Sequence, residues 1–374
     1  MNEFFKFLKD KSFLSALFFI LLTESFLQLG CYKVFLKKSS YAKTVNRVTD
    51  TAVKSLEVLK VNTIIMGTSI AYEGISPRIL NEKLNPYSVS IQSIAIPGSE
   101  FIVQELALRK VLENSNDIKY VIHVNELQLP WVDRKELLTA TLSMVSEFNR
   151  MEAVRKLKED DYKTDYTDYG YLFLRYVAYR RDMADFILSP EKRLKDIGRE
   201  IRGEFSLYAY SNEYRESMGL YKFNTIEDCI KATMPGIVIP SGSNEFHRDS
   251  INKTCRLAGE SKFSLSKNES TDLYKKRLSN LYKYIKSKNI QIINVYPPVP
   301  MILDYDDYKK RMEFWESEYR DILSDIRFDL SGSVEKENNS DYYFDMIHLN
   351  QRGMFLFSNA LSETLIQYFK EKKL

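Results

Sequence analysis

The stretch LKVNTIIMGTS, residues 59–69, contains an apolar run at residues 64–66 that ends at Gly67. A short, uninterrupted apolar run closed by a turn residue is typical of a strand buried on both faces of a sheet. Ser69 follows the glycine directly. The stretch therefore predicts a buried strand with a serine just beyond its carboxyl end.

Four further segments carry the same signal, a short apolar run followed by Gly, Pro or a polar turn. They are SVSIQSIAIPG (88–98), IKYVIHVNE (118–126), NIQIINVYPPVP (289–300) and IRFDLSG (326–332). Segments with a helical pattern, such as residues 101–114, separate them. Strands that alternate with helices favour a parallel sheet covered on both faces. The sequence therefore predicts an α/β fold, a three-layer sandwich with a parallel sheet of about five strands.

About 160 residues separate the third expected strand from the fourth. A crossover between parallel strands needs only a dozen or more residues. We therefore predict a mostly helical insertion at about residues 131–287, rich in Tyr, Lys and Arg. Two roles are open for it: a cap over the site, or a subdomain that only supports the sheet.

The composition excludes some classes of protein. The 374 residues include 54 basic and 51 acidic side chains in a well-mixed order, whereas a nucleic-acid platform needs clustered basic charge. The three cysteines lack the CxxC spacing of a metal knuckle. Cys229 and Cys255 either pair, as in an extracytoplasmic domain, or are unrelated thiols.

The N-terminus predicts a membrane segment. Residues 13–36 reach the ~20 mostly apolar residues that a spanning helix needs, although they include Glu24 and Gln28. An uncleaved anchor, a cleaved signal peptide and a lipoprotein signal ending at Cys31 are the three alternatives. We favour the anchor, because apolar character resumes after Glu24. This divides the chain into a cytoplasmic tail (1–12), the anchor (13–36), a polar helical stalk (37–58) and a domain (59–374).

The anchor raises a question about Glu24. An ionised carboxylate inside lipid is unfavourable by a few kcal/mol on insertion scales. We therefore expect Glu24 to be protonated or to face a polar group on another membrane protein.

The segment DMIHLNQRG, residues 345–353, supplies what a serine nucleophile needs. A serine hydroxyl requires a base within hydrogen-bond reach, and that base requires an orienting carboxylate. Asp345 and His348 are three residues apart in an expected loop before an apolar C-terminal helix. We predict that Asp345 orients His348 and that His348 faces Ser69. Asn350 is interpreted as the cap of the last helix.

Two further positions are candidates for stabilising an oxyanion. Gly98 ends the second expected strand, and Asn125 ends the third. Since the carboxyl ends of parallel strands meet at one edge, both should lie near Ser69. The backbone N–H groups of Ser69 and Gly98 and the Asn125 amide then form a candidate oxyanion hole.

This order of residues resembles the SGNH/GDSL hydrolase superfamily: Ser after strand one, Gly after strand two, Asn after strand three, Asp-x-x-His before the last helix. The resemblance covers residues 59–130 and 288–374, without the insertion. The sequence departs from the family pattern where Thr68 replaces its Asp, and where His123 and Glu126 stand in place of the Gly and Asp around its Asn. With its N-terminal membrane segment, the sequence resembles one bacterial branch of this superfamily, which includes the alginate O-acetyltransferase accessory proteins and the D-alanyl-lipoteichoic acid protein.

The resemblance implies an SGNH-like, membrane-anchored serine O-acyltransferase or esterase. Its site would be Ser69 as nucleophile, Asp345 and His348 as its partners, and Gly98 and Asn125 as oxyanion donors, with no metal or organic cofactor. The implied partners are an envelope polysaccharide or lipid-linked glycan and a multi-span membrane acyltransferase, with no nucleic acid. The implied location is extracytoplasmic, in the periplasm or at the cell surface. The alternative is an inactive member that binds or scaffolds envelope glycans.

Overall fold

The computed structural model describes residues 10–126, 135–202, 206–209, 212, 214–218, 245–260, 267–301, 305–334 and 340–372. The chain divides into two compact units. Unit 1 comprises Met1–Arg47 and Lys135–Phe205, and unit 2 comprises Val48–Arg134 and Ser206–Leu374. The expected single domain over 59–374 is thus divided differently. The first part of the insertion groups with the N-terminal segment, and the remainder groups with the sheet.

Unit 2 is built on a five-stranded parallel sheet, as the sequence predicts. Its strands, in the order β2-β1-β3-β4-β5, are β2 (Ile91–Ser93), β1 (Thr63–Met66), β3 (Tyr120–Val124), β4 (Gln291–Tyr296) and β5 (Arg327–Asp329). The central strands are almost fully buried, which explains why apolar residues predominate in them. This strand order is doubly wound and reverses direction between β1 and β3. In such sheets, ligands bind beyond the carboxyl ends of the strands at that reversal.

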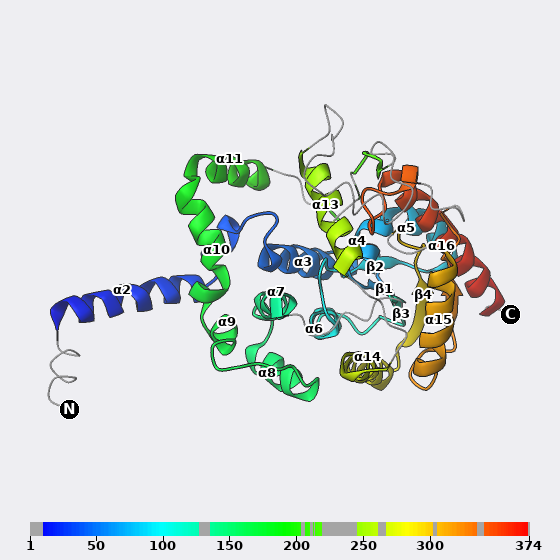
Figure 1. Cartoon of the computed structure of the whole chain (residues 1–374), viewed down its shortest axis with the longest axis horizontal. Helices are drawn as coiled ribbons and strands as arrows, with labels where there is room; N and C mark the ends of the chain where they lie inside the picture. Colours follow the sequence, from blue (N-terminus) through cyan, green and yellow to red (C-terminus); the bar gives the residue numbers. More distant parts are fainter. Residues whose placement is uncertain are drawn as a thin grey trace. The chain divides into compact units, whose positions relative to one another are not determined.

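Helices cover both faces of the sheet. His123 of β3 contacts Gln104 of α6 (Phe101–Leu112) and Tyr282 of α14 (Glu269–Ser287). Tyr120, of opposite parity on the same strand, packs its ring on Phe369 of α16 (Gln351–Lys372). Because alternate residues of a strand point to opposite faces, α6 and α14 cover one face and α16 the other. In Figure 1, α6 and α14 lie below the strands and α16 lies above them.

The remaining helices of unit 2 are short or flank the strands. They are α4 (Ser69–Gly74), α5 (Pro77–Leu84), η2 (Asn85–Tyr87), α13 (Glu245–Glu260), α15 (Tyr305–Tyr319) and η4 (Ser340–Tyr342). Unit 1 contains α2 (Lys11–Gln28), η1 (Lys33–Phe35), α7 (Lys135–Val145), α8 (Arg150–Glu159), α9 (Tyr169–Phe173), α10 (Arg175–Leu188) and α11 (Pro190–Ile201). The described part of unit 1 is helical.

The expected stalk is a helix, α3 (Tyr41–Leu59), but it is not a free polar spacer. Its apolar residues recur every three or four positions and are buried: Val45, Val48, Ala52 and Leu56 are 0–5% exposed. An apolar stripe of this spacing faces a core. The expected polar helical stalk is therefore a helix with a buried apolar stripe along one face.

The cysteines differ in state. Cys31 is a free, exposed thiol, and Cys255 is disulfide-bonded. Cys229, with which the sequence leaves a pairing open, lies outside the described residues. The apolar N-terminal segment forms α2, and among the described residues α2 is apolar and long enough to cross a membrane. By length and composition, a signal sequence would pass the same test.

Candidate active site

Ser69 is the first residue of α4, a six-residue helix that follows β1. The sequence predicts a tight turn here, and the structure instead begins a short helix because Thr68 caps it. Thr68 Oγ1 accepts a hydrogen bond from Ile70 N at 3.4 Å. Since β1 and β3 flank the reversal of strand order, Ser69 lies where a doubly wound sheet binds its ligands.

Gly67 lets the strand and this short helix approach closely. A Cβ at Gly67 would lie 2.7 Å from Ala71 Cβ and 3.3 Å from the Val124 carbonyl oxygen. Contacts this short force neighbouring atoms to move, so a larger residue would displace the turn that carries Ser69. The glycine that closes the first apolar run thus positions the serine.

His348 and Asp345 lie in a loop that hydrogen bonds hold closed. Tyr343 and Leu349 pair as an antiparallel bridge, and Phe344 N donates to the His348 carbonyl at 2.8 Å. Asn350 Oδ1 then accepts from the backbone N–H groups of Arg352 and Gly353 in the first turn of α16, so its expected role as a cap is confirmed. The loop therefore has a fixed shape on the last helix.

The three predicted residues form one hydrogen-bonded chain. Ser69 Oγ lies 2.9 Å from His348 Nε2, and His348 Nδ1 lies 2.9 Å from Asp345 Oδ2. Because a carboxylate only accepts, Nδ1 carries the proton and the neutral ring presents Nε2 as an acceptor to the serine. These distances place a base and its orienter as a serine nucleophile requires.

Asp345 is fully buried and held by four donors. Besides the His348 ring, these are the backbone N–H groups of Ile347 and His348 and the hydroxyl of Ser250, at 2.6 Å. Burial alone would raise the pKa of Asp345. The charge on His348 and the hydrogen bonds outweigh burial and hold the pKa below its usual value. Asp345 therefore stays ionised beside the histidine.

Ser250 is a site residue that the sequence does not reveal. It lies on α13, within the predicted insertion and 95 positions from Asp345. The same helix supports the loop at two more points. Thr254 Oγ1 accepts from Met346 N at 3.2 Å, and His247 Nε2 donates to the Phe344 carbonyl. This part of the insertion therefore supports the Asp345–His348 loop directly.

Glu126 is a second residue without a sequence-based role. It directly follows the strand-end Asn125, is 9% exposed, and accepts a hydrogen bond from Thr68 Oγ1. The bond joins the ends of β1 and β3 one residue before Ser69. Burial raises the pKa of Glu126 to about 7, against the lowering effects of Thr68 and His348. A carboxyl group that titrates near neutrality thus lies next to the serine.

His348 is a stronger base than an ordinary histidine. Burial lowers its pKa, but Asp345, and to a lesser degree Glu73 and Glu126, raise it to about 9. A general base must be neutral before it accepts a proton. The neutral, basic form of the ring therefore becomes more populated as the pH rises towards 9.

This electrostatic arrangement makes a prediction. Replacing Glu126 by Gln removes one negative charge near His348, so the pKa of His348 should fall. The acid limb of the rate profile for serine acylation should then move to lower pH, with the fold intact. Measuring acylation rates from pH 5 to pH 10 for both proteins tests this. Unchanged acid limbs would show that Glu126 does not influence the histidine.

Asn125 is fully buried, and its side-chain amide contacts Tyr282 of α14, on the face of the sheet that α14 covers. Its Nδ2 donates to the Tyr282 hydroxyl at 3.3 Å, and the same hydroxyl contacts His123 Nδ1 at 2.7 Å and the Asn294 side chain. Burial lowers the pKa of His123 to about 3, so His123 is neutral. His123 and Asn125 therefore share a buried polar network under α14, and an oxyanion role for Asn125 stays a prediction.

The predicted role of Asn125 has a measurable consequence. If its amide stabilises the oxyanion, Asn125→Ala should slow acylation by roughly 10²–10³-fold, the usual loss for one donor. Tyr282→Phe removes the hydroxyl that shares the Asn125 amide and serves as the matched control. A structural role alone would lower the melting temperature of both variants and leave the acylation rate of the folded protein nearly unchanged.

Gly98 lies in a loop that is hydrogen-bonded to the segment just before the serine. The backbone at Gly98 has φ of +69°, a conformation that favours glycine. Ile96 N and Ser99 Oγ both donate to the carbonyl of Gly67, two residues before Ser69. The loop that carries Gly98 is thus attached to the turn that carries the serine, as the prediction of an N–H donor there requires.

The described residues contain no group of three or more His, Cys, Asp or Glu side chains able to hold a metal ion.

Comparison of the chain with protein-family models and with curated protein sequences finds no match. Any assignment of function to this site therefore rests on its geometry and chemistry.

Proposed function

We propose that this protein is a serine O-acyltransferase or esterase of SGNH type. The observation that carries the proposal is the chain of hydrogen bonds from Ser69 through His348 to Asp345. The chain lies at the reversal point of a doubly wound sheet, where ligands bind. Three residues from two distant parts of the sequence meet there with the spacing of a nucleophile, a base and an orienting carboxylate.

The reaction would begin with attack of Ser69 Oγ on the carbonyl carbon of an acyl donor. The hydroxyl proton passes to His348 Nε2, and the carbonyl oxygen becomes an oxyanion near the N–H groups of Ser69 and Gly98. When the oxyanion collapses, the bond to the leaving group breaks and His348 returns the proton to it. The oxygen of a second hydroxyl then attacks the carbonyl carbon of acyl-Ser69 while His348 accepts its proton. The bond between the acyl group and Ser69 Oγ breaks, and His348 returns the proton to Ser69 Oγ.

The second hydroxyl decides between transfer and hydrolysis, since water gives an esterase and a sugar hydroxyl gives a transferase. We propose an envelope polysaccharide or lipid-linked glycan as acceptor. A candidate spanning helix at the N-terminus and a disulfide at Cys255 support an extracytoplasmic domain. A multi-span membrane acyltransferase that delivers acyl groups is the proposed partner.

The proposal is tested by intact mass spectrometry after incubation with an activated acetyl ester. We expect one added acetyl group, and a peptide map should place it on Ser69. Addition of a polysaccharide acceptor should then remove the group faster than buffer alone if the protein is a transferase. No acylation at any pH between 6 and 10 would contradict the proposal and favour a non-catalytic glycan-binding protein.

A further inference from the structure

The two polar residues of the apolar helix α2 have partners within this chain. Glu24 Oε1 accepts from Arg175 N at 2.8 Å, and its Oε2 accepts from Tyr176 N at 2.9 Å. Gln28 Nε2 donates to the Phe173 carbonyl at 2.9 Å. The expectation that Glu24 faces a polar group on another membrane protein is therefore not needed, because unit 1 itself supplies that group.

These bonds replace a missing helix cap. Arg175 and Tyr176 are the first residues of α10, and the preceding Leu174 has no side chain able to cap their N–H groups. The Glu24 carboxylate supplies the acceptors instead, at the positive end of the helix dipole. Glu24 and Gln28 are one helical turn apart, so both reach the turn between α9 and α10 from one face of α2.

The end of α2 is also part of the unit 1 core. Leu27 is 2% exposed and belongs to a buried cluster with Leu36, Ala42 and Tyr179. Arg150 donates to Gln28 Oε1. Removal of the residues before about position 30 would leave a cavity in this cluster and uncap α10. The structure therefore favours a retained anchor over a cleaved signal peptide.

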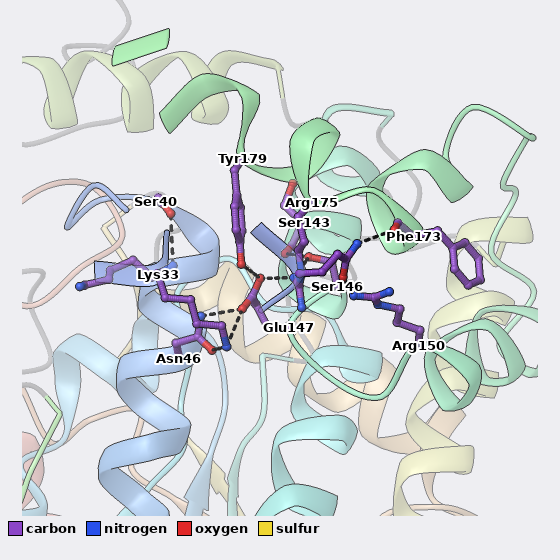
Figure 2. A network of polar contacts seen from close by, with 12 residues as sticks. Lys33, Ser40, Asn46, Ser143, Ser146, Glu147, Arg150, Phe173, Arg175 and Tyr179 are labelled. Atoms are coloured by element: carbon purple, nitrogen blue, oxygen red, sulfur yellow. Dashed lines mark hydrogen bonds and ion pairs between the residues drawn. The ribbon is translucent and has the colours of Figure 1, made fainter. Parts of the chain in front are cut away.

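A buried carboxylate fixes the start of α10 from its other side. Figure 2 shows Glu147 at the centre of a polar network, with Arg175, Tyr179, Asn46 and Lys33 around it. The Glu147 side chain is fully buried, and Tyr179 donates to it at 2.8 Å and Asn46 at 2.6 Å. The turn that α2 caps is thus held rigidly within unit 1.

The same turn exposes apolar side chains. Phe173, Leu174 and Tyr176 are 40%, 47% and 54% exposed. On α2, Leu22 and Phe26, which flank Glu24 along the helix, are 53% and 47% exposed. The turn therefore continues the exposed apolar surface of α2, while its Phe173 carbonyl and the N–H groups of Arg175 and Tyr176 are bonded to Gln28 and Glu24.

We propose that the turn Phe173–Tyr176 enters the membrane interface beside α2 as a second, non-spanning membrane contact. If α2 spans, its 18 residues cover about 27 Å of a hydrocarbon core about 30 Å thick. Glu24 then lies only about 20 Å along the axis from Lys11, so the backbone bonded to it is at bilayer depth. Backbone at that depth must be hydrogen-bonded internally, which Glu24 and Gln28 achieve.

The proposal is tested with the full chain in phospholipid bilayers, using a nitroxide label on one introduced cysteine at a time. The background is Cys31→Ser, which removes the free thiol and keeps the disulfide of Cys255. Leu174→Cys carries the test label. Phe18→Cys in the middle of α2 is the bilayer reference, and Glu363→Cys on α16, with its side chain 74% exposed, is the aqueous reference. The measurement compares two collision rates of the nitroxide. Collisions with oxygen are frequent for a label in lipid, and collisions with a water-soluble nickel chelate are frequent for a label in water.

We expect the label at residue 174 to lie between the two references, with more oxygen collisions and fewer nickel collisions than the label at Glu363. A nickel accessibility at 174 equal to that at 363, while 18 remains protected, would overturn the membrane contact. Nickel access at 18 would overturn it as well, because α2 would then not span. Sequencing of the N-terminus of membrane-purified protein should find it before Lys11, and a start near position 30 would also refute the proposal.

Discussion

Ser69→Ala and His348→Ala should each abolish formation of an acyl-enzyme from an activated ester. Loss of a serine nucleophile or its histidine base in a comparable triad costs about 10⁶-fold in rate. The two losses should not add in the double variant, because Ser69 and His348 act as one unit across a 2.9 Å hydrogen bond. Stopped-flow release of the leaving group and intact mass measure the effect directly.

Ser250→Ala is the matched control for this experiment, since it removes a hydroxyl that donates to Asp345 without removing the proposed nucleophile. A lost hydrogen bond to a charged group costs about 1.5–3 kcal/mol at most. The acylation rate should therefore fall by roughly ten- to a hundredfold, and the acyl group should still form. A Ser69→Ala protein that labels as fast as the wild type would refute the proposed nucleophile.

Asp345→Asn should have the second largest effect, a loss of about 10⁴-fold, as for the corresponding change in a well-studied serine triad. An amide in place of the carboxylate can present its NH₂ group to His348 Nδ1. The ring would then carry its proton on Nε2, where it cannot accept the serine proton. The loss should nevertheless be smaller than that of His348→Ala, because the base itself remains.

The pH dependence of this variant separates orientation from charge. Asp345 raises the pKa of His348, so its removal should lower that pKa and move the acid limb of the residual activity below pH 9. Glu126→Gln should move the limb in the same direction without the large loss in rate. A near-wild-type rate for Asp345→Asn at every pH would show that the carboxylate is not needed.

The sheet was predictable because its strands are buried on both faces. Residues 64–66 are a continuous apolar run, and apolar residues predominate in β3 and β4 although His123 and Asn294 interrupt them. These segments therefore indicate strands without reference to the rest of the fold. The spacing of Val45, Val48 and Ala52 also indicates that α3 has an amphipathic face. This spacing indicates that the helix expected as a stalk packs one face against a core.

The candidate site was predictable where its chemistry is local in sequence. Asp345 and His348 lie in one short segment, and the residue types alone indicate their roles. Ser250 and Glu126 were not predictable. Ser250 reaches Asp345 from a helix 95 positions away, and Glu126 gains its raised pKa from burial next to Thr68. Such contacts follow from tertiary packing, which residue spacing does not encode.

The cap that Glu24 provides for α10 has a consequence for how the protein is made. Its backbone partners lie 151 and 152 residues further along the chain. At about 5–20 residues per second, a ribosome reaches them roughly 8 to 30 seconds after it has added Glu24. If α2 enters the membrane on emergence, it does so with an uncompensated carboxylate. The helix would then be a weak insertion signal, and it would be stabilised in the membrane only after α10 has been synthesised and has bonded to Glu24.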